Sequence, residues 1–206
     1  MTAGGHTTAR YEVAGFAGIG LATGIVTMFI QPFGGLAGPA LEDLAGDVRW
    51  LDSLFEFVAA WGPGFVFGAA LGAWIARRGP RSVWRWLGFT AASTGSWYAG
   101  VTAAIRATDF VPAGAGDLAE PLISGFAGGL VGAAIVAAGA ALCYPFARRI
   151  ATVAAITAVG AVAGLLLAAG YDNGPHLLFP VWQTLVAALI GAAATRRTGT
   201  QSRSAT

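Results

Sequence analysis

Charged residues are scarce in this chain. Only 11% of its 206 residues are Asp, Glu, Lys or Arg, whereas 56% are hydrophobic. A soluble domain carries about a quarter charged residues and rarely contains apolar stretches of about 18 residues or more. Uncharged stretches of that length recur along this chain. The scarcity of charge therefore argues against an ordinary soluble domain and predicts an integral membrane protein.

Residues that support metal or redox chemistry are also scarce. Cys143 is the only cysteine, so neither an intrachain disulfide nor a CxxC site is possible. The two histidines, His6 and His176, are too few and too far apart in the sequence to predict a haem or zinc site. No Walker motif occurs, so an ATP-driven role would require a partner chain. We expect no metal and no cofactor.

Lysine is absent, and the formal net charge is only +2. The arginines cluster at the ends of apolar runs, where they act as topology signals rather than as a phosphate-binding face. No Asp, Glu or His lies in the middle of an apolar run, and proton-coupled transporters and redox subunits usually require such groups. The lipid bilayer, and not nucleic acid, is the expected partner.

The long apolar runs predict an all-α integral membrane protein with a six-transmembrane-helix bundle. A helix needs roughly 20 residues to cross about 30 Å of hydrocarbon. Six segments satisfy this length: 13–30, 57–76, 86–105, 121–147, 150–171 and 177–195. We expect residues 1–206 to form one domain, with a flexible cytoplasmic tail at 198–206.

The arginines predict the direction of the bundle. Ten of the twelve flank the first span or follow an even-numbered one: Arg10, Arg77, Arg78, Arg81, Arg85, Arg148, Arg149, Arg196, Arg197 and Arg203. The connections on the opposite side hold nine of the ten acidic residues. Because positive residues mark the cytoplasmic side, both termini are expected inside, in a bacterial or archaeal cytoplasmic membrane.

The longest connection, 31–56, has its own pattern. Leu41, Leu44, Val48, Leu51 and Phe55 recur at helical spacing, while acidic residues occupy the other faces. This pattern predicts an amphipathic outer segment at about 37–55. It is compatible with a lid over an outward-facing cavity and with a strap that only shields the backbone.

Small residues recur every fourth position in several spans. Two such rows are Gly64, Gly68 and Gly72 on the second span, and Ser124, Gly128 and Gly132 on the fourth. Small residues allow close packing of helix backbones in lipid, so these rows predict helix-packing seams. They would join helices of this chain, other membrane subunits, or copies of the chain in a homo-oligomer.

The sequence LISGFAGG at 122–129 raises a second interpretation of Ser124. The layout resembles that of rhomboid-type intramembrane serine proteases, which have six spans, internal termini, a serine high on the fourth span and a histidine at the sixth. The resemblance implies Ser124 and His176 as a catalytic pair. However, the first glycine of that family's GxSG motif is Leu122 here, and His176 lies in the loop DNGPH. We therefore assign no catalytic residue.

The third predicted span is the most polar. Thr90, Thr94, Tyr98, Thr102 and Arg106 follow at four-residue intervals, with Trp97 alongside. Residues four apart share a helix face, and polar groups within hydrocarbon face protein or a water-filled cavity. The row predicts a solute site in the outer half, formed by Thr94, Trp97, Tyr98, Thr102, Arg106 and Gln183. Alternatively, these hydroxyls bond to carbonyls of their own or neighbouring helices.

Three functional hypotheses follow. The first is a small-solute transport or substrate-capture membrane component, whose layout is similar to that of the substrate-binding components of energy-coupling-factor transporters. That similarity is one of architecture, without a shared motif. The second is a non-catalytic structural subunit or assembly factor of a larger membrane complex. The third is the rhomboid-like intramembrane hydrolase.

Overall fold

The computed structural model describes residues 4–30, 49–78, 82–144, 146, 148–169 and 177–195, and across these residues it contains helices and no strand. The helices are α1 (Gly4–Ile30), α3 (Arg49–Arg78), α4 (Val83–Thr108), α5 (Ala119–Cys143), α6 (Arg149–Gly164), α7 (Leu166–Ala169) and α8 (Leu178–Thr195). The expected tail at 198–206 and most of the amphipathic segment, up to residue 48, lie outside the described residues.

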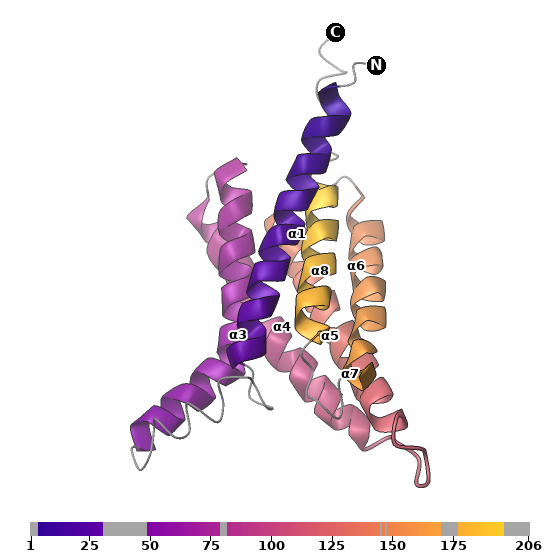
Figure 1. The fold of residues 1–206 in the computed structure, drawn as a ribbon. Coiled ribbons are helices and arrows are strands. Elements are labelled where there is room, and N and C mark those ends of the chain that lie inside the picture. Colours follow the sequence, from indigo (N-terminus) through magenta and orange to yellow (C-terminus); the bar gives the residue numbers. More distant parts are fainter. Residues whose placement is uncertain are drawn as a thin grey trace.

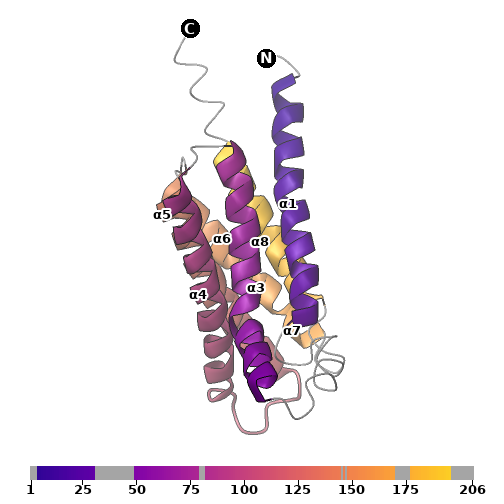
Figure 2. The same ribbon diagram turned by 90° about the vertical axis from the view of Figure 1, so that its left-hand side faces the viewer.

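The six long helices form a closed ring. Each packs against two neighbours, in the order α1, α3, α4, α5, α6, α8 and back to α1. The most extensive interfaces are those of α4 with α5 and of α1 with α8 (Figures 1 and 2). The start of α1 and the end of α8 lie at the same end of the bundle, called here the terminal end; the other end is the distal end (Figure 1).

Four helices are long and apolar enough to cross a membrane: Glu12–Ile30 of α1, Phe57–Arg77 of α3, Ala119–Cys143 of α5, and Arg149–Ala169, which joins α6 and α7. Large apolar side chains also cover the outside of the bundle, such as Leu142 and Ile150, which are 79% and 86% exposed. An exterior of this kind suits lipid. The prediction of helices is confirmed for the described residues, and four of these helices have the length and apolar composition that a membrane span needs.

The remaining two predicted spans form helices of a different character. α4 has 26 residues but carries a series of hydroxyl side chains that lowers its hydropathy. α8 has 18 residues and is apolar, but it is short for a span, at about 27 Å for a rise of about 1.5 Å per residue. Both helices nevertheless belong to the ring, since α4 packs between α3 and α5, and α8 packs between α6 and α1.

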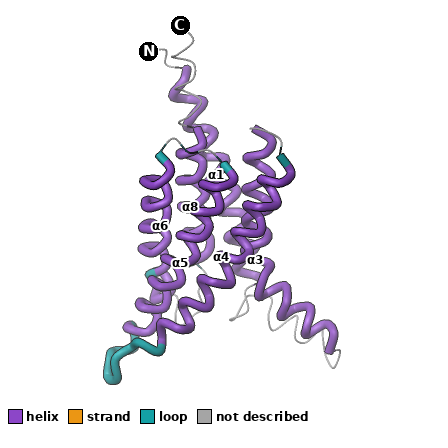
Figure 3. The backbone as a smooth tube through the Cα atoms, turned by 180° about the vertical axis from the view of Figure 1, so that it is seen from behind, coloured by secondary structure: helices purple, strands orange, loops and turns teal. Residues whose placement is uncertain are grey.

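Several helix ends differ from the predicted ranges. α3 begins at Arg49, so the last part of the predicted 37–55 segment is continuous with the second span. This first part of α3 leans away from the bundle, and Pro63 lies inside the helix, where a missing N–H commonly permits a bend (Figures 1 and 3). α5 ends at Cys143, before residue 147, and Leu165 separates α6 from α7.

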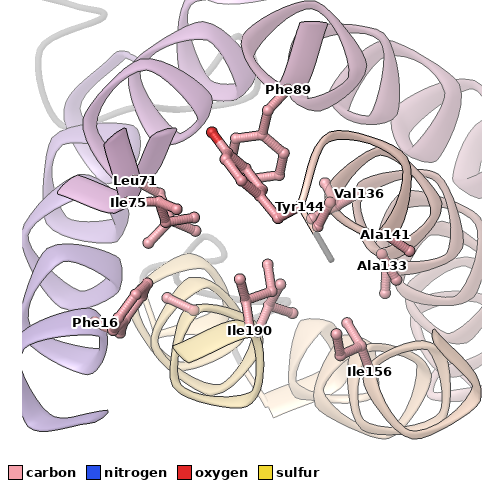
Figure 4. Close-up of a cluster of buried hydrophobic side chains, with 14 of the residues drawn as sticks. Phe16, Leu71, Ile75, Phe89, Ala133, Val136, Ala141, Tyr144, Ile156 and Ile190 are labelled. Carbon is pink, nitrogen blue, oxygen red and sulfur yellow. The ribbon is translucent and has the colours of Figure 1, made fainter. Parts of the chain in front are cut away.

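The apolar core fills the terminal half of the ring. Side chains from all six long helices meet there, among them Phe16, Leu71, Phe89, Val136, Ile156 and Ile190, each at most 3% exposed (Figure 4). Phe89 also packs edge-on against Tyr144, with ring centroids 5.7 Å apart. Because every helix contributes to this cluster, close packing of its apolar side chains holds the ring closed.

Candidate functional site

A cavity of about 450 Å³ occupies the distal half of the ring. It is lined by the last part of α4, the first parts of α5 and α8, the middle of α3, the end of α6, and α7. The lining is mostly apolar, and the cavity is partly open. Its volume falls in the range of small-molecule sites.

One wall of the cavity is made of glycine. Gly125, Gly128, Gly129 and Gly132 of α5 and Gly164 of α6 all line it. These glycines also bring helix backbones together, since a Cβ atom on Gly129 would lie 3.0 Å from Cα of Gly164. Gly125, Gly129 and Gly164 therefore tighten the α5–α6 contact, Gly128 and Gly132 lie against α4, and all five leave space free of side chains inside the ring.

Aromatic side chains form another part of the lining. Phe67 of α3, Trp97 of α4, and Phe179 and Trp182 of α8 line the cavity. The rings of Trp97 and Phe179 are 5.1 Å apart between centroids, and those of Phe67 and Trp182 are 6.4 Å apart. Tilted contacts at these distances are favourable aromatic arrangements. They fix the shape of the apolar surface that a solute would meet.

The serine hydroxyls at the cavity already donate hydrogen bonds to backbone carbonyl oxygens. Ser93 donates to Gly64 on α3 at 2.8 Å, which links two helices. Ser96 donates to Ser93 at 2.7 Å, and Ser124 donates to Glu120 at 2.7 Å, both within their own helices. These bonds satisfy buried hydroxyl donors that would otherwise be costly in an apolar setting.

Gln183 and Trp182 differ from these serines. Gln183 is 2% exposed and donates through Nε2 to Oγ1 of Thr27 on α1 at 2.9 Å. Its Oε1 and the indole Nε1 of Trp182 are buried without a hydrogen-bond partner in the described part of the chain. Both atoms are enclosed by protein, and Nε1 of Trp182 lies near Gly160 of α6, 3.2 Å from where a Cβ atom there would be. They are therefore unpaired polar groups within the helix packing, which is uncommon for buried atoms.

The structure places the six predicted site residues in two groups. Trp97 and Gln183 line the cavity. Thr94 does not, and its hydroxyl donates to the carbonyl of Thr90 at 2.9 Å. Tyr98 is 53% exposed and stacks on Trp61 at 5.0 Å, outside the cavity lining. Thr102 and Arg106 are exposed and also lie outside that lining.

The predicted small-residue rows lie inside the ring. Gly64 and Gly68 face α4, where a Cβ atom on Gly68 would lie 2.7 Å from Cβ of Ser93. Gly72 lies against the rings of Trp86 and Phe89. The second row, Ser124, Gly128 and Gly132, lines the cavity. Helices of the same chain therefore occupy both rows.

The sequence interpretation did not include several residues that form the cavity. Phe67, Phe179 and Trp182 line the cavity but were not among the predicted site residues. One available signal was the recurrence of Ser93, Trp97, Gly100 and Ala104 on α4 at intervals of four, three and four residues, which follows one helix face.

The residues required for the enzyme hypothesis are not brought together in the described chain. His176 lies outside the described residues. Among the residues that are described, no group of three His, Cys, Asp or Glu side chains is placed to hold a metal.

Searches with this chain find no match among family models, curated proteins or solved structures. Function is therefore argued from the geometry of the cavity.

Proposed function

We propose that the protein binds a small, mainly apolar solute in the distal cavity, as a capture or transport component of a bacterial or archaeal cytoplasmic membrane. The observation that carries this proposal is the division of the ring into two halves. The terminal half is filled by the apolar core, whereas the distal half holds a partly open cavity of about 450 Å³. A pocket that is closed at one end supports uptake from the other.

In this proposal all six long helices cross the membrane, and both termini are cytoplasmic. The start of α1 and the end of α8 lie at one end of the bundle, as an even number of crossings requires (Figure 2). Arg77, Arg85, Arg148 and Arg149 belong to helix ends on that same side. Positive residues favour the cytoplasmic side, so the cavity opens toward the outside.

The alternative functions receive less support from the same geometry. An assembly subunit would use the glycine rows to bind other proteins, but neighbouring helices of this chain already occupy those two rows. A hydrolase would need the Ser124 hydroxyl to be activated by a base, and that hydroxyl instead donates to the carbonyl of Glu120. Neither alternative function makes use of the cavity, whereas solute binding does.

Filling the cavity tests the proposal directly. Val101 lines the cavity, whereas Val162 on α6 is 64% exposed on the outside of the ring. The variant Val101→Trp places a large side chain in the cavity, and Val162→Trp makes the same change toward lipid. Native mass spectrometry of membrane-purified protein should detect a bound small molecule on the wild type and on Val162→Trp, and not on Val101→Trp. Equal adducts on all three folded proteins would reject the cavity as the site.

A further inference from the structure

We propose that the cavity selects lipophilic cations, which are solutes with an elongated apolar body and a protonated amine at one end. The carboxylate of Glu120 receives that amine at the distal rim. This inference rests on the proposed function, because it names the class of solute that the cavity takes. Its basis is the depth of the cavity and the position of Glu120, the one ionisable residue among the described residues that line it.

The cavity is deep along α4 and α5. Ser96 and Gly132 lie at the same level in its inner part, since the carbonyl oxygen of Ser96 is 3.5 Å from where a Cβ atom on Gly132 would be. Thr108 and Glu120 also line the cavity, and each lies twelve residues nearer the distal end of its helix. Twelve residues of α-helix extend about 18 Å at a rise of about 1.5 Å per residue. A lining of this depth suits an elongated solute.

The inner part of the cavity is aromatic. Trp182 reaches the level of Gly132, because its Cζ2 atom is 3.7 Å from where a Cβ atom on that glycine would be. Phe67 contacts Trp182 with ring centroids 6.4 Å apart, and Trp97 follows Ser96 on α4. An apolar body packs well against such rings, but membrane hydrocarbon is equally apolar. Apolar contact alone therefore gives a solute little reason to leave lipid, and a polar contact is needed to retain it.

Glu120 offers that polar contact at the rim. It is exposed, so a solute can reach it, and it forms no ion pair in the described part of the chain. Ser124 follows it by one helical turn and also lines the cavity, which places both residues on the same side of α5. The hydroxyls of Ser124 and Thr108 already donate to backbone carbonyls. A carboxylate is the strongest acceptor in this set, and a protonated amine forms charge-assisted hydrogen bonds with it.

The charge of the distal end disfavours anions. No Lys, Arg or His is present among the described residues that line the cavity. The three stretches between predicted spans at this end contain nine of the ten acidic residues and only two of the twelve arginines. Charge of this sign attracts cations and repels anions. An anionic solute would meet the carboxylate of Glu120 without a counter-ion, whereas an amine would be paired.

Three probes that share a biphenyl body test the inference: 4-phenylbenzylamine, which is protonated at neutral pH, the neutral 4-phenylbenzyl alcohol, and the anion 4-phenylbenzoate. Each is titrated by calorimetry into the full chain in nanodiscs of zwitterionic lipid, with empty nanodiscs subtracted. Because Glu120 is exposed, water screens the ion pair, and the amine should bind roughly two- to fivefold more tightly than the alcohol. The carboxylate should bind more weakly than the alcohol. Equal affinities for amine and alcohol, or tightest binding of the carboxylate, would overturn the inference.

Two variants assign the preference to Glu120. Glu120→Gln keeps the shape of the side chain and removes its charge, so it should bring the ratio of amine to alcohol affinity close to one. Asp117→Asn is the matched control, because Asp117 is exposed three residues earlier but does not line the cavity. This control should keep the wild-type ratio. A ratio that is unchanged in Glu120→Gln, or that falls equally in both variants, would overturn the role of Glu120.

The Val101→Trp variant separates failure of this inference from failure of the proposed function. If amine and alcohol bind the wild type equally and Val101→Trp abolishes both, the inference fails and the cavity is a binding site without selection for cations. If Val101→Trp leaves the binding of both probes unchanged, the cavity does not hold the solute, and the proposed function fails together with the inference.

Discussion

The side chain of Gln183 on α8 donates a hydrogen bond through Nε2 to Oγ1 of Thr27 on α1, with 2.9 Å between the two atoms. The two residues are 156 positions apart in the sequence. Both side chains are buried, at 2% and 0% exposure. This contact joins the first and last helices of the ring, which also share one of its most extensive interfaces. It therefore closes the ring and fixes the orientation of Gln183, the one amide side chain among the described residues that line the cavity.

Thr27→Val should destabilise the protein, because it leaves Nε2 of Gln183 buried without a partner. The cost of such a group is about 1–3 kcal/mol, and interhelical bonds in membranes lie at the lower end of that range. The matched control is Thr184→Val on α8, whose hydroxyl donates only to Pro180 of its own helix. Thermal unfolding in detergent should show a lower midpoint for Thr27→Val than for Thr184→Val. Equal midpoints would show that the contact contributes little to closing the ring.

Gly129→Ala should also destabilise the ring, through a different mechanism. The added Cβ atom would lie 3.0 Å from Cα of Gly164, so backbone rather than a flexible side chain must move. Overpacking of this kind costs about 1–3 kcal/mol. The control is Gly95→Ala on α4, where nothing lies within 4 Å of the added atom. Alanine should be neutral there or slightly stabilising, because it favours helix more than glycine does. Matching losses of stability at the two positions would contradict the close α5–α6 contact.

The sequence indicated the membrane helices more readily than the wall of the cavity. Apolar runs of sufficient length predict membrane-spanning helices whatever they pack against, and four helices of the described chain have that length and composition. The site depends instead on the direction in which each side chain points. A row of residues at four-residue intervals drifts by about 40° at each step, because the α-helix turns about 100° per residue.

The row on α4 shows the effect of this drift. Thr90, at its start, is 5% exposed and lies against α3, whereas Tyr98 is 53% exposed. Arg106, four steps from Thr90, has turned by about 160° and is exposed. A row that alternates steps of four and three residues keeps its direction, and Ser93, Trp97, Gly100 and Ala104 follow it along the cavity. The contact of Gln183 with Thr27 was not predictable from either helix alone, since it depends on how the ring closes.

Trp97→Ala and Tyr98→Ala distinguish the cavity from the polar row predicted on α4. Trp97 lines the cavity and contacts the ring of Phe179, whereas Tyr98 stacks on Trp61 outside the lining. We expect Trp97→Ala to weaken the binding of 2-naphthol, used here as a small neutral probe with an aromatic ring, by roughly tenfold, which corresponds to about 1.4 kcal/mol of lost aromatic contact. Tyr98→Ala should change it by less than about threefold. Calorimetry in nanodiscs measures both, and a larger loss for Tyr98→Ala would favour the row over the cavity.

The orientation of the bundle can be tested with single cysteines, because Cys143 is the only one to replace. In a Cys143→Ser background, Ala113→Cys labels the connection between α4 and α5, and Arg148→Cys labels the start of α6; both positions are exposed. α5 separates them with 25 residues, a length of about 38 Å at about 1.5 Å per residue, enough to cross a bilayer. A membrane-impermeant maleimide should therefore modify Ala113→Cys on intact cells and Arg148→Cys only after permeabilisation. The reverse pattern would mean that the cavity opens toward the cytoplasm. The protein would then release a solute into the cell rather than capture one from outside. Labelling of both positions from outside would mean that α5 does not cross the membrane, in which case the ring is not a transmembrane bundle.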